Sequence, residues 1–234
     1  MRILATLLLL LGALYSNGQS FAQERPMDLQ AFLKDFPPGA DVRPLSGELP
    51  AKLKEHAHPT LIEFWQTVGI GSFGDGFITF FDPRDQEAML ARWLLLKQPD
   101  PTRIPIARTA FGDLIYFRDL RQKAVEKGLP ADWKYASDVV FLSIHHRNSA
   151  AITWSMDGFF AGDLKNFLQE EPRTYYSLYT SMSERRLGPG ECFYFVPALV
   201  LGGQATRQSI GHGDCSVHQD ILLQLAPSPP SPGK

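Results

Sequence analysis

The chain lacks the features that mark several protein classes. It has only two cysteines in 234 residues, Cys192 and Cys215, which excludes a disulfide-rich scaffold. Lysine and arginine number 23 against 25 aspartates and glutamates, so the net charge is −2 and the strongly basic balance of a nucleic-acid-binding domain is missing. The 44% hydrophobic and 21% charged residues are ordinary for a globular protein, and the length allows one large or two small domains with a sizeable core.

Motifs for catalysis and cofactor binding are also missing. The glycine-rich segment 69–76 (GIGSFGDG) follows a predicted helix and precedes a predicted strand, the reverse of the order in a phosphate cradle. No nucleophile elbow is present. The carboxylate pairs Asp82/Asp85 and Glu170/Glu171 stand at predicted helix ends, where Asp82 is expected to cap a helix. Nothing places either pair in the apolar pocket that acid–base catalysis needs, so we expect no enzymatic activity and no cofactor.

The histidines do not form a convincing metal motif. Segment 212–218 (HGDCSVH) contains zinc-ligand residue types, but its spacing is not that of a closed site, and we expect a polar turn into the last helix. His145 and His146 are neighbours in a predicted strand, so their side chains point to opposite faces and cannot chelate one metal. We expect one of them inside, the other at the surface, and no bound metal.

The first 22 residues differ in kind from the rest. Arg2 precedes an uncharged apolar run at 3–15, and residues 20–22 (SFA) have the small-x-small pattern of a signal-peptidase site. We therefore expect residues 1–22 to be a cleaved signal peptide, with the mature chain starting at Gln23; the alternative is a translation start at Met27. The protein is periplasmic in the first case and cytoplasmic in the second. In an exported chain the two cysteines can pair once, whereas in the cytosol they stay reduced.

Apolar periodicity predicts short helices alternating with hairpins. We expect helices over 27–36, 49–55, 59–68, 82–96, 162–168, 175–187 and 217–225, and strands over 76–82, 104–110, 114–117, 139–145, 151–156 and 192–196. Trp65 and Trp93 lie on apolar helix faces and are expected in the core. The polar, irregular segment 122–138 is the candidate boundary between two halves, and residues 227–234 (PSPPSPGK) are expected to be disordered.

Several of these stretches, taken in order, resemble known families. Segments 32–36 (FLKDF) and 61–65 (LIEFW), the glycine-entered strand at Gly76 and the helix from Pro83 to Trp93-Leu94 resemble the GAD-like domain, which would occupy residues 28–121 and include the hairpin at 105–116. Segments 187–191 (LGPGE), 194–199 (YFVPAL) and 201–203 (LGG) resemble the C-terminal domain of immunity proteins against type VI secretion DNase effectors, which would occupy residues 139–226.

The resemblance implies an α+β fold of antiparallel hairpins with packed helices, in a SUKH-like or GAD-like immunity architecture. It also implies a protein that binds a cognate toxin, a type VI effector, and neutralises it without catalysis. A DNase acts in the cytoplasm, which conflicts with a signal peptide. Either the chain starts at Met27, or its toxin acts in the envelope, or its function has drifted. The alternative hypothesis is a small-molecule or nucleotide-binding regulator, or an unrecognised enzyme, with a pocket between the two halves.

Turn residues are the candidate partner contacts, because loops on a rigid scaffold commonly carry binding residues. Asp75 lies in the glycine turn, Phe111 and Asp113 at one predicted hairpin tip, and Arg147 and Asn148 at another. We expect charge reversal at Asp75 or Asp113 to weaken partner binding while leaving the fold intact.

Overall fold

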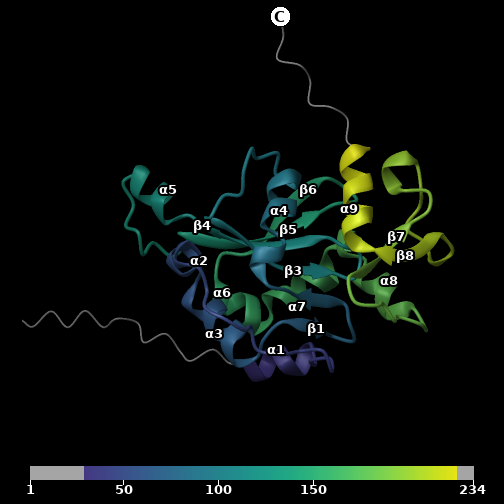
Figure 1. The fold of residues 1–234 in the computed structure, drawn as a ribbon, viewed down its shortest axis with the longest axis horizontal. Coiled ribbons are helices and arrows are strands. Elements are labelled where there is room, and N and C mark those ends of the chain that lie inside the picture. Colours follow the sequence, from purple (N-terminus) through teal and green to yellow (C-terminus); the bar gives the residue numbers. More distant parts are fainter. Residues whose placement is uncertain (1–28, 226–234) are drawn as a thin grey trace, which may run out of the picture.

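A computed structural model describes residues 29–225 of the chain (Figure 1). Its α-helices are α1 (Leu29–Asp35), α2 (Ala51–His56), α3 (Pro59–Thr67), α4 (Glu87–Trp93), α5 (Arg121–Glu126), α6 (Met156–Gly158), α7 (Leu164–Glu170), α8 (Tyr176–Ser181) and α9 (Cys215–Gln224). Its strands are β1 (Gly71–Phe73), β2 (Ile78–Phe80), β3 (Arg103–Thr109), β4 (Leu114–Asp119), β5 (Ser137–Ser143), β6 (Asn148–Thr153), β7 (Glu191–Phe195) and β8 (Ile210–Asp214).

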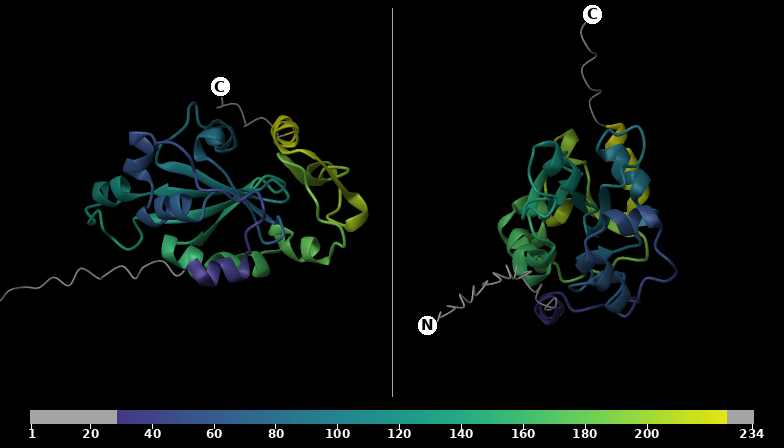
Figure 2. Two further views of the ribbon diagram at one scale, coloured as in Figure 1. Left: turned by 60° about the horizontal axis from the view of Figure 1, so that its bottom comes forward. Right: turned by 90° about the vertical axis from the view of Figure 1, so that its left-hand side faces the viewer.

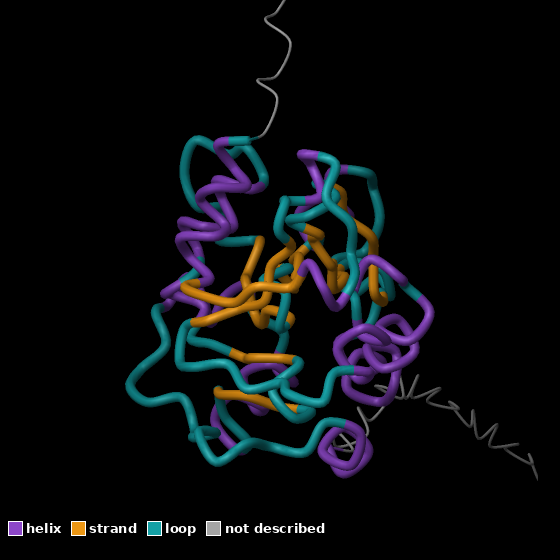
Figure 3. The backbone as a smooth tube through the Cα atoms, turned by 90° about the vertical axis from the view of Figure 1, so that its right-hand side faces the viewer, coloured by secondary structure: helices purple, strands orange, loops and turns teal. Residues whose placement is uncertain are grey.

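The centre of the molecule is an antiparallel six-stranded sheet in which every strand pairs with its neighbour in sequence, in the order β1-β2-β3-β4-β5-β6. Strands β7 and β8 form a separate two-stranded ribbon. The strands lie in the middle and the helices around them (Figure 3). The predicted α+β class, antiparallel hairpins with packed helices, is confirmed.

Helices cover both faces of the sheet (Figure 2). Each face has its own apolar cluster. The larger cluster is aromatic, with ring centroids 4.7–6.4 Å apart; its central rings are Phe32, Phe64, Phe73, Phe80 and Phe160. The smaller cluster joins α4 and α9 to strands β4 and β5. Trp65 is fully buried in the first cluster and Trp93 is buried in the second, which confirms both predicted core positions.

Local capping explains several helix boundaries. Pro59 occupies the first turn of α3, and the side chain of Asp82 accepts a hydrogen bond from the Arg84 amide, as predicted. Two predicted helices are shorter in the structure. A 3₁₀ turn at Pro83–Asp85 precedes α4, which ends at Trp93 rather than at 96, and α8 ends at Ser181 because Met182 is extended.

The polar segment 122–138 connects two paired strands. Strands β4 and β5 pair from Leu114↔Leu142 to Asp119↔Ser137, so the sheet continues without a break from one predicted half into the other. The segment includes most of helix α5, which the sequence pattern did not predict. The proposed signal peptide, both alternative start positions and the proline-rich tail lie outside the described residues.

Candidate partner-binding site

Three of the five predicted contact residues reach the surface. Asp75 is exposed in a left-handed turn, where its carbonyl accepts a 2.5 Å hydrogen bond from the Tyr179 hydroxyl. Asn148 is exposed at the start of β6. Arg147 is half-buried, and its guanidinium donates a 3.0 Å hydrogen bond to the Leu222 carbonyl. These three positions remain proposed contacts. Within residues 29–225, no hydrogen bond or ion pair joins Asp75 to Arg147 or Asn148, so they do not form one site.

The prediction that Phe111 and Asp113 stand at an exposed hairpin tip is wrong. Both are fully buried, because the β3–β4 turn lies beneath the β7–β8 ribbon and α9. The Phe193 amide donates to the Ala110 carbonyl at 2.7 Å, and the Gln219 side chain donates to the Gly112 carbonyl at 2.8 Å. Asp113 therefore supports the interior, and charge reversal there would disrupt the fold.

The carboxyl group of Asp113 lies in a closed polar cluster. It accepts hydrogen bonds from the Ile144 amide at 2.9 Å and from the Thr109 hydroxyl at 3.2 Å. Burial raises the pKa of Asp113 to about 8, and these hydrogen bonds only partly offset the effect. The group is therefore protonated at neutral pH, which removes the cost of an unpaired buried charge.

Gly112 explains how closely the turn can approach the ribbon. Its φ is +81°, and a Cβ added there would lie 3.1 Å from the Cys215 sulfur and 3.2 Å from the Cys192 sulfur. Both cysteines are buried as free thiols. Contact with Cys215, together with burial, raises the pKa of the Cys192 thiol, so this cysteine is poorly suited to act as a nucleophile.

One of the two neighbouring histidines is buried and the other exposed, as predicted, but both lie in the turn after β5, which ends at Ser143, and not in a strand. His145 is buried and hydrogen-bonds through Nε2 to the Phe111 carbonyl at 2.9 Å, whereas His146 is exposed and contacts the Tyr175 hydroxyl. In segment 212–218, His212 is exposed on β8 and His218 is buried in the first turn of α9. Asp214 caps that helix, so the segment is a strand leading into a helix rather than the predicted turn. Within residues 29–225, no three His, Cys, Asp or Glu side chains are placed to hold a metal.

Replacing His218 with phenylalanine is expected to make the protein less sensitive to acid. Burial lowers the pKa of His218 from 6.5 to about 4, and its Nε2 has no hydrogen-bond partner among the described residues. Neutral His218 therefore stabilises the fold fully above pH 6.5, and this contribution is lost as the pH falls towards 4. Wild type should lose about 1–2 kcal/mol more than the variant over this range in urea titrations. His212→Phe, at an exposed position, is the control, and parallel acid limbs for wild type and His218→Phe would contradict the assignment.

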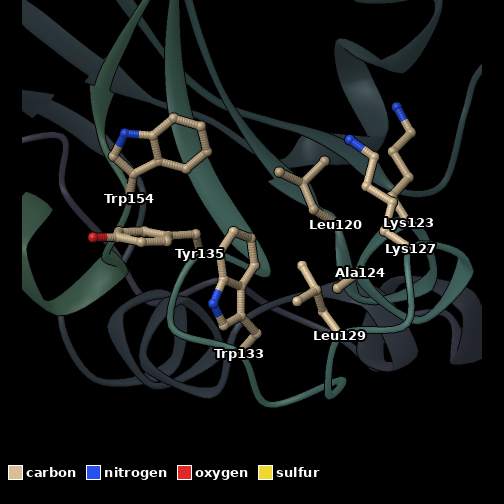
Figure 4. A pocket seen from close by; sticks show the side chains of 8 residues that line it. All are labelled: Leu120, Lys123, Ala124, Lys127, Leu129, Trp133, Tyr135 and Trp154. Carbon is tan, nitrogen blue, oxygen red and sulfur yellow. The ribbon is translucent and has the colours of Figure 1, made fainter.

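An exposed aromatic groove is the most distinct surface feature of the described residues (Figure 4). Trp133, Tyr135 and Trp154 are 38%, 37% and 46% exposed. Their rings meet edge to face, with centroids 5.0 Å apart for Trp133 and Tyr135 and 5.8 Å apart for Tyr135 and Trp154. The groove has a volume of about 510 Å³; its other lining residues are Leu120, Lys123, Ala124, Lys127 and Leu129. We call this feature the aromatic groove.

Three elements build the aromatic groove. Helix α5 provides Lys123 and buries Ala124, the loop that follows it provides Trp133 and Tyr135, and Trp154 directly follows the edge strand β6. Helix α5 is anchored at its start by Asp119, which accepts hydrogen bonds from the Arg121 amide and side chain. The groove is therefore attached to the central sheet at both walls.

Around the aromatic groove, the negative charge of Asp119 is paired and part of the positive charge is not. Burial acts to raise the pKa of Asp119, but the hydrogen bonds from Arg121 and His56 together outweigh burial, and the net pKa is lowered. This carboxylate is therefore ionised and already paired. Lys123 and Lys127 form no ion pair with any described residue, and Lys134 lies over the Tyr135 ring at 4.6 Å. The groove therefore presents unpaired positive charge beside exposed aromatic rings.

This arrangement suits recognition of another molecule. Exposed tryptophan and tyrosine with a cationic rim are the usual anchors of protein interfaces, and the volume also lies within the range of small-molecule pockets. Sequence reasoning missed the site because it interpreted 122–138 as an irregular boundary. The signal that could have found it is the clustering of Trp133, Tyr135 and Trp154 with lysines in a polar stretch, where no helix or strand period explains the aromatic residues.

The structure is thus that of an α+β protein with an exposed aromatic groove at one end of its central sheet. Residues 28–127 match the family model of the GAD-like domain. Residues 155–226 match the family model described as type VI secretion system immunity protein Tdi1, C-terminal. The chain thus contains the two predicted family segments in the predicted order. The rings of Trp133, Tyr135 and Trp154 belong to residues between these two matches.

Comparison with other proteins adds evidence on the fold. The crystal structure of Atu4351 from Agrobacterium tumefaciens is similar, with a TM-score of 0.58 and 17% sequence identity, over 86% of this chain and 94% of that chain. At this identity the likeness supports the fold alone. No curated protein sequence matches the chain. Among residues 29–225, no helix combines the length and apolarity needed to cross a membrane.

Proposed function

We propose that this chain is an immunity protein that binds a cognate type VI effector and neutralises it by occupying its surface, without catalysis. The observation that carries the proposal is the match of residues 155–226 to the immunity-protein family. The exposed aromatic groove supports it, because a tight inhibitor needs aromatic anchors at its interface. The buried, protonated Asp113 and the buried thiols supply no exposed reactive group. The effector is proposed to be a DNase, by analogy with the family that the sequence resembles.

The compartment follows from the effector in this proposal. An immunity protein against a DNase acts in the cytoplasm, which requires a start at Met27. An immunity protein against an effector that acts in the envelope must instead be exported, which requires cleavage before Gln23. Intact-mass measurement of the natively expressed chain decides between the two, and a chain still beginning at Met1 contradicts both.

Inhibition of the effector is expected to saturate at about one equivalent of this protein. The probe is the purified product of a toxin-like gene, sought beside the gene for this chain, with its own activity as the readout. A binding inhibitor removes effector molecules one by one, so the residual activity falls linearly to the equivalence point when both proteins are well above Kd. Full protection at about a hundredth of an equivalent would show an enzymatic antidote, and the absence of a complex would overturn the immunity function.

A second candidate function rests on the size of the aromatic groove. A volume of about 510 Å³ lies within the range of small-molecule sites, so a regulator of small-molecule or nucleotide-binding type is the alternative. The lining residues between 120 and 127 belong to the segment that matches the GAD-like domain, and the other four stand between the two matched segments. Thermal shift with a metabolite panel, together with no effect of the neighbouring gene product, would favour this alternative.

A further inference from the structure

The two edges of the central sheet differ in how they are protected. Edge strand β1 is partly covered by the segment before it, since Gly39 donates to the Ser72 carbonyl and Arg43 exchanges hydrogen bonds with Ile70. Edge strand β6 pairs with β5 on one side, and none of the backbone hydrogen bonds within residues 29–225 reaches its outer side. Unpaired strand edges are templates for another strand, and proteins usually protect them.

Strand β6 also lacks the side chains that normally keep an edge from pairing. Its sequence is NSAAIT, without lysine or proline, and Ser149 and Ala151 are exposed. A partner strand would lie at the 4.7–4.9 Å spacing of neighbouring strands. The absence of charge and proline along β6 therefore leaves residues 149–153 open to strand addition.

The outer edge of β6 leads directly into the aromatic groove. Trp154 follows the last residue of β6, and its ring contacts Tyr135. A strand laid along β6 would therefore deliver its next side chain to the exposed rings. Lys123 and Lys127 line the same groove without ion-pair partners among the described residues, so they would be complemented by carboxylates on the incoming strand.

We propose that β6 is a docking edge for an extended, acidic segment of the effector, which adds a strand to the sheet and places an apolar side chain among Trp133, Tyr135 and Trp154. Main-chain hydrogen bonds to β6 provide affinity, and the groove and its lysines provide selectivity. This inference rests on the proposed immunity function, whose effector supplies the segment.

A second copy of this chain fits the edge less well. In an antiparallel β6–β6 pair, the two-fold axis would place the groove end of one strand against the Arg147 end of the other. Cationic groups would then face each other across the interface instead of finding carboxylates. An acidic partner removes this repulsion, which is why the charge selects the effector segment.

Two groove variants test the side-chain part of the proposal. Trp154→Ala is expected to weaken effector binding about 30-fold, as at an aromatic hot spot. The double variant Lys123→Glu/Lys127→Glu is expected to weaken it at least about tenfold, with a smaller salt dependence of the association rate. Matched controls are Leu201→Ala, which truncates a side chain that is 62% exposed beside the β7–β8 ribbon, and Lys34→Glu on α1. Circular dichroism checks that each variant is folded.

Hydrogen–deuterium exchange tests the backbone part. The amides of 149–153 that face away from β5 should exchange quickly in the free chain and at least about tenfold more slowly in the complex. Peptides of about ten residues tiled across the effector sequence should reproduce this protection only where carboxylates flank an apolar residue.

The outcomes separate the two proposals. If no complex forms with the unmodified chain, the immunity function fails and this inference fails with it. If the complex forms, but both groove variants bind as well as the controls and β6 gains no protection, this inference alone is overturned. A third outcome is that, in the absence of effector, the β6 amides become protected as the concentration of this chain rises and sedimentation shows a dimer. That result would overturn the effector segment as the occupant of β6 and assign the edge to a second copy of this chain.

Discussion

Trp65→Ala is expected to lower the free energy of unfolding by about 3–5 kcal/mol, which would be enough to unfold a marginally stable domain. The indole is fully buried in the aromatic cluster between α3 and the sheet, so its removal leaves a cavity that the surrounding rings cannot fill. Its Nε1 has no hydrogen-bond partner among the described residues, so the loss comes almost entirely from packing. The melting temperature should fall by on the order of 10 °C.

Trp133→Ala is the matched control for this experiment. The same truncation at a 38% exposed ring should change stability by less than about 1 kcal/mol. The comparison comes from chemical denaturation of both variants, monitored by far-ultraviolet circular dichroism. If the two variants lost equal free energy of unfolding, the burial of Trp65 would not be the source of the expected stabilisation.

Asp113→Asn is expected to make the protein more stable than wild type in alkali. Asp113 has a pKa of about 8 in the fold, against a reference value of 3.8 for the unfolded chain. Below pH 4 the group is protonated in both states, so its contribution to stability is fully present. As the pH rises to about 8, the unfolded chain gives up its proton and wild type loses about 3–5 kcal/mol. Asparagine mimics the protonated acid at every pH and keeps an acceptor for the Ile144 amide.

The measurement is a set of urea titrations between pH 4 and pH 9. The variant should match wild type within about 1 kcal/mol near pH 4, and it should be the more stable protein near pH 9. Asp75→Asn at the exposed turn is the control and should show no pH-dependent gain. Identical curves for Asp113→Asn and wild type would mean that the carboxyl group is ionised in the fold.

Local signals in the sequence were sufficient for much of the fold. Pro59 and Asp82 mark helix starts through backbone chemistry, and the apolar spacing around Trp65 and Trp93 gave their burial. These features depend on neighbours a few residues away. The hairpins around Gly112 and Arg147 were found for the same reason, because turn residues interrupt two alternating runs.

Features that depend on distant contacts could not be predicted in this way. Phe111 and Asp113 have the local pattern of an exposed turn, but Phe193 and Gln219, some 80 to 110 residues later, cover them. The aromatic groove was missed for a related reason. Trp133 and Trp154 are separated by two strands, and only the β5–β6 pairing brings them to the same end of the sheet.

The placement of strands β5 and β6 has a consequence for how such proteins diversify. These strands and the groove rings come from the stretch between the two matched families, whereas the largest aromatic cluster is drawn mainly from the matched segments. Substitutions at the exposed rings can therefore reshape the aromatic groove while most of the buried aromatic packing stays the same. If the groove binds the effector as proposed, this separation lets its specificity change at little cost in stability.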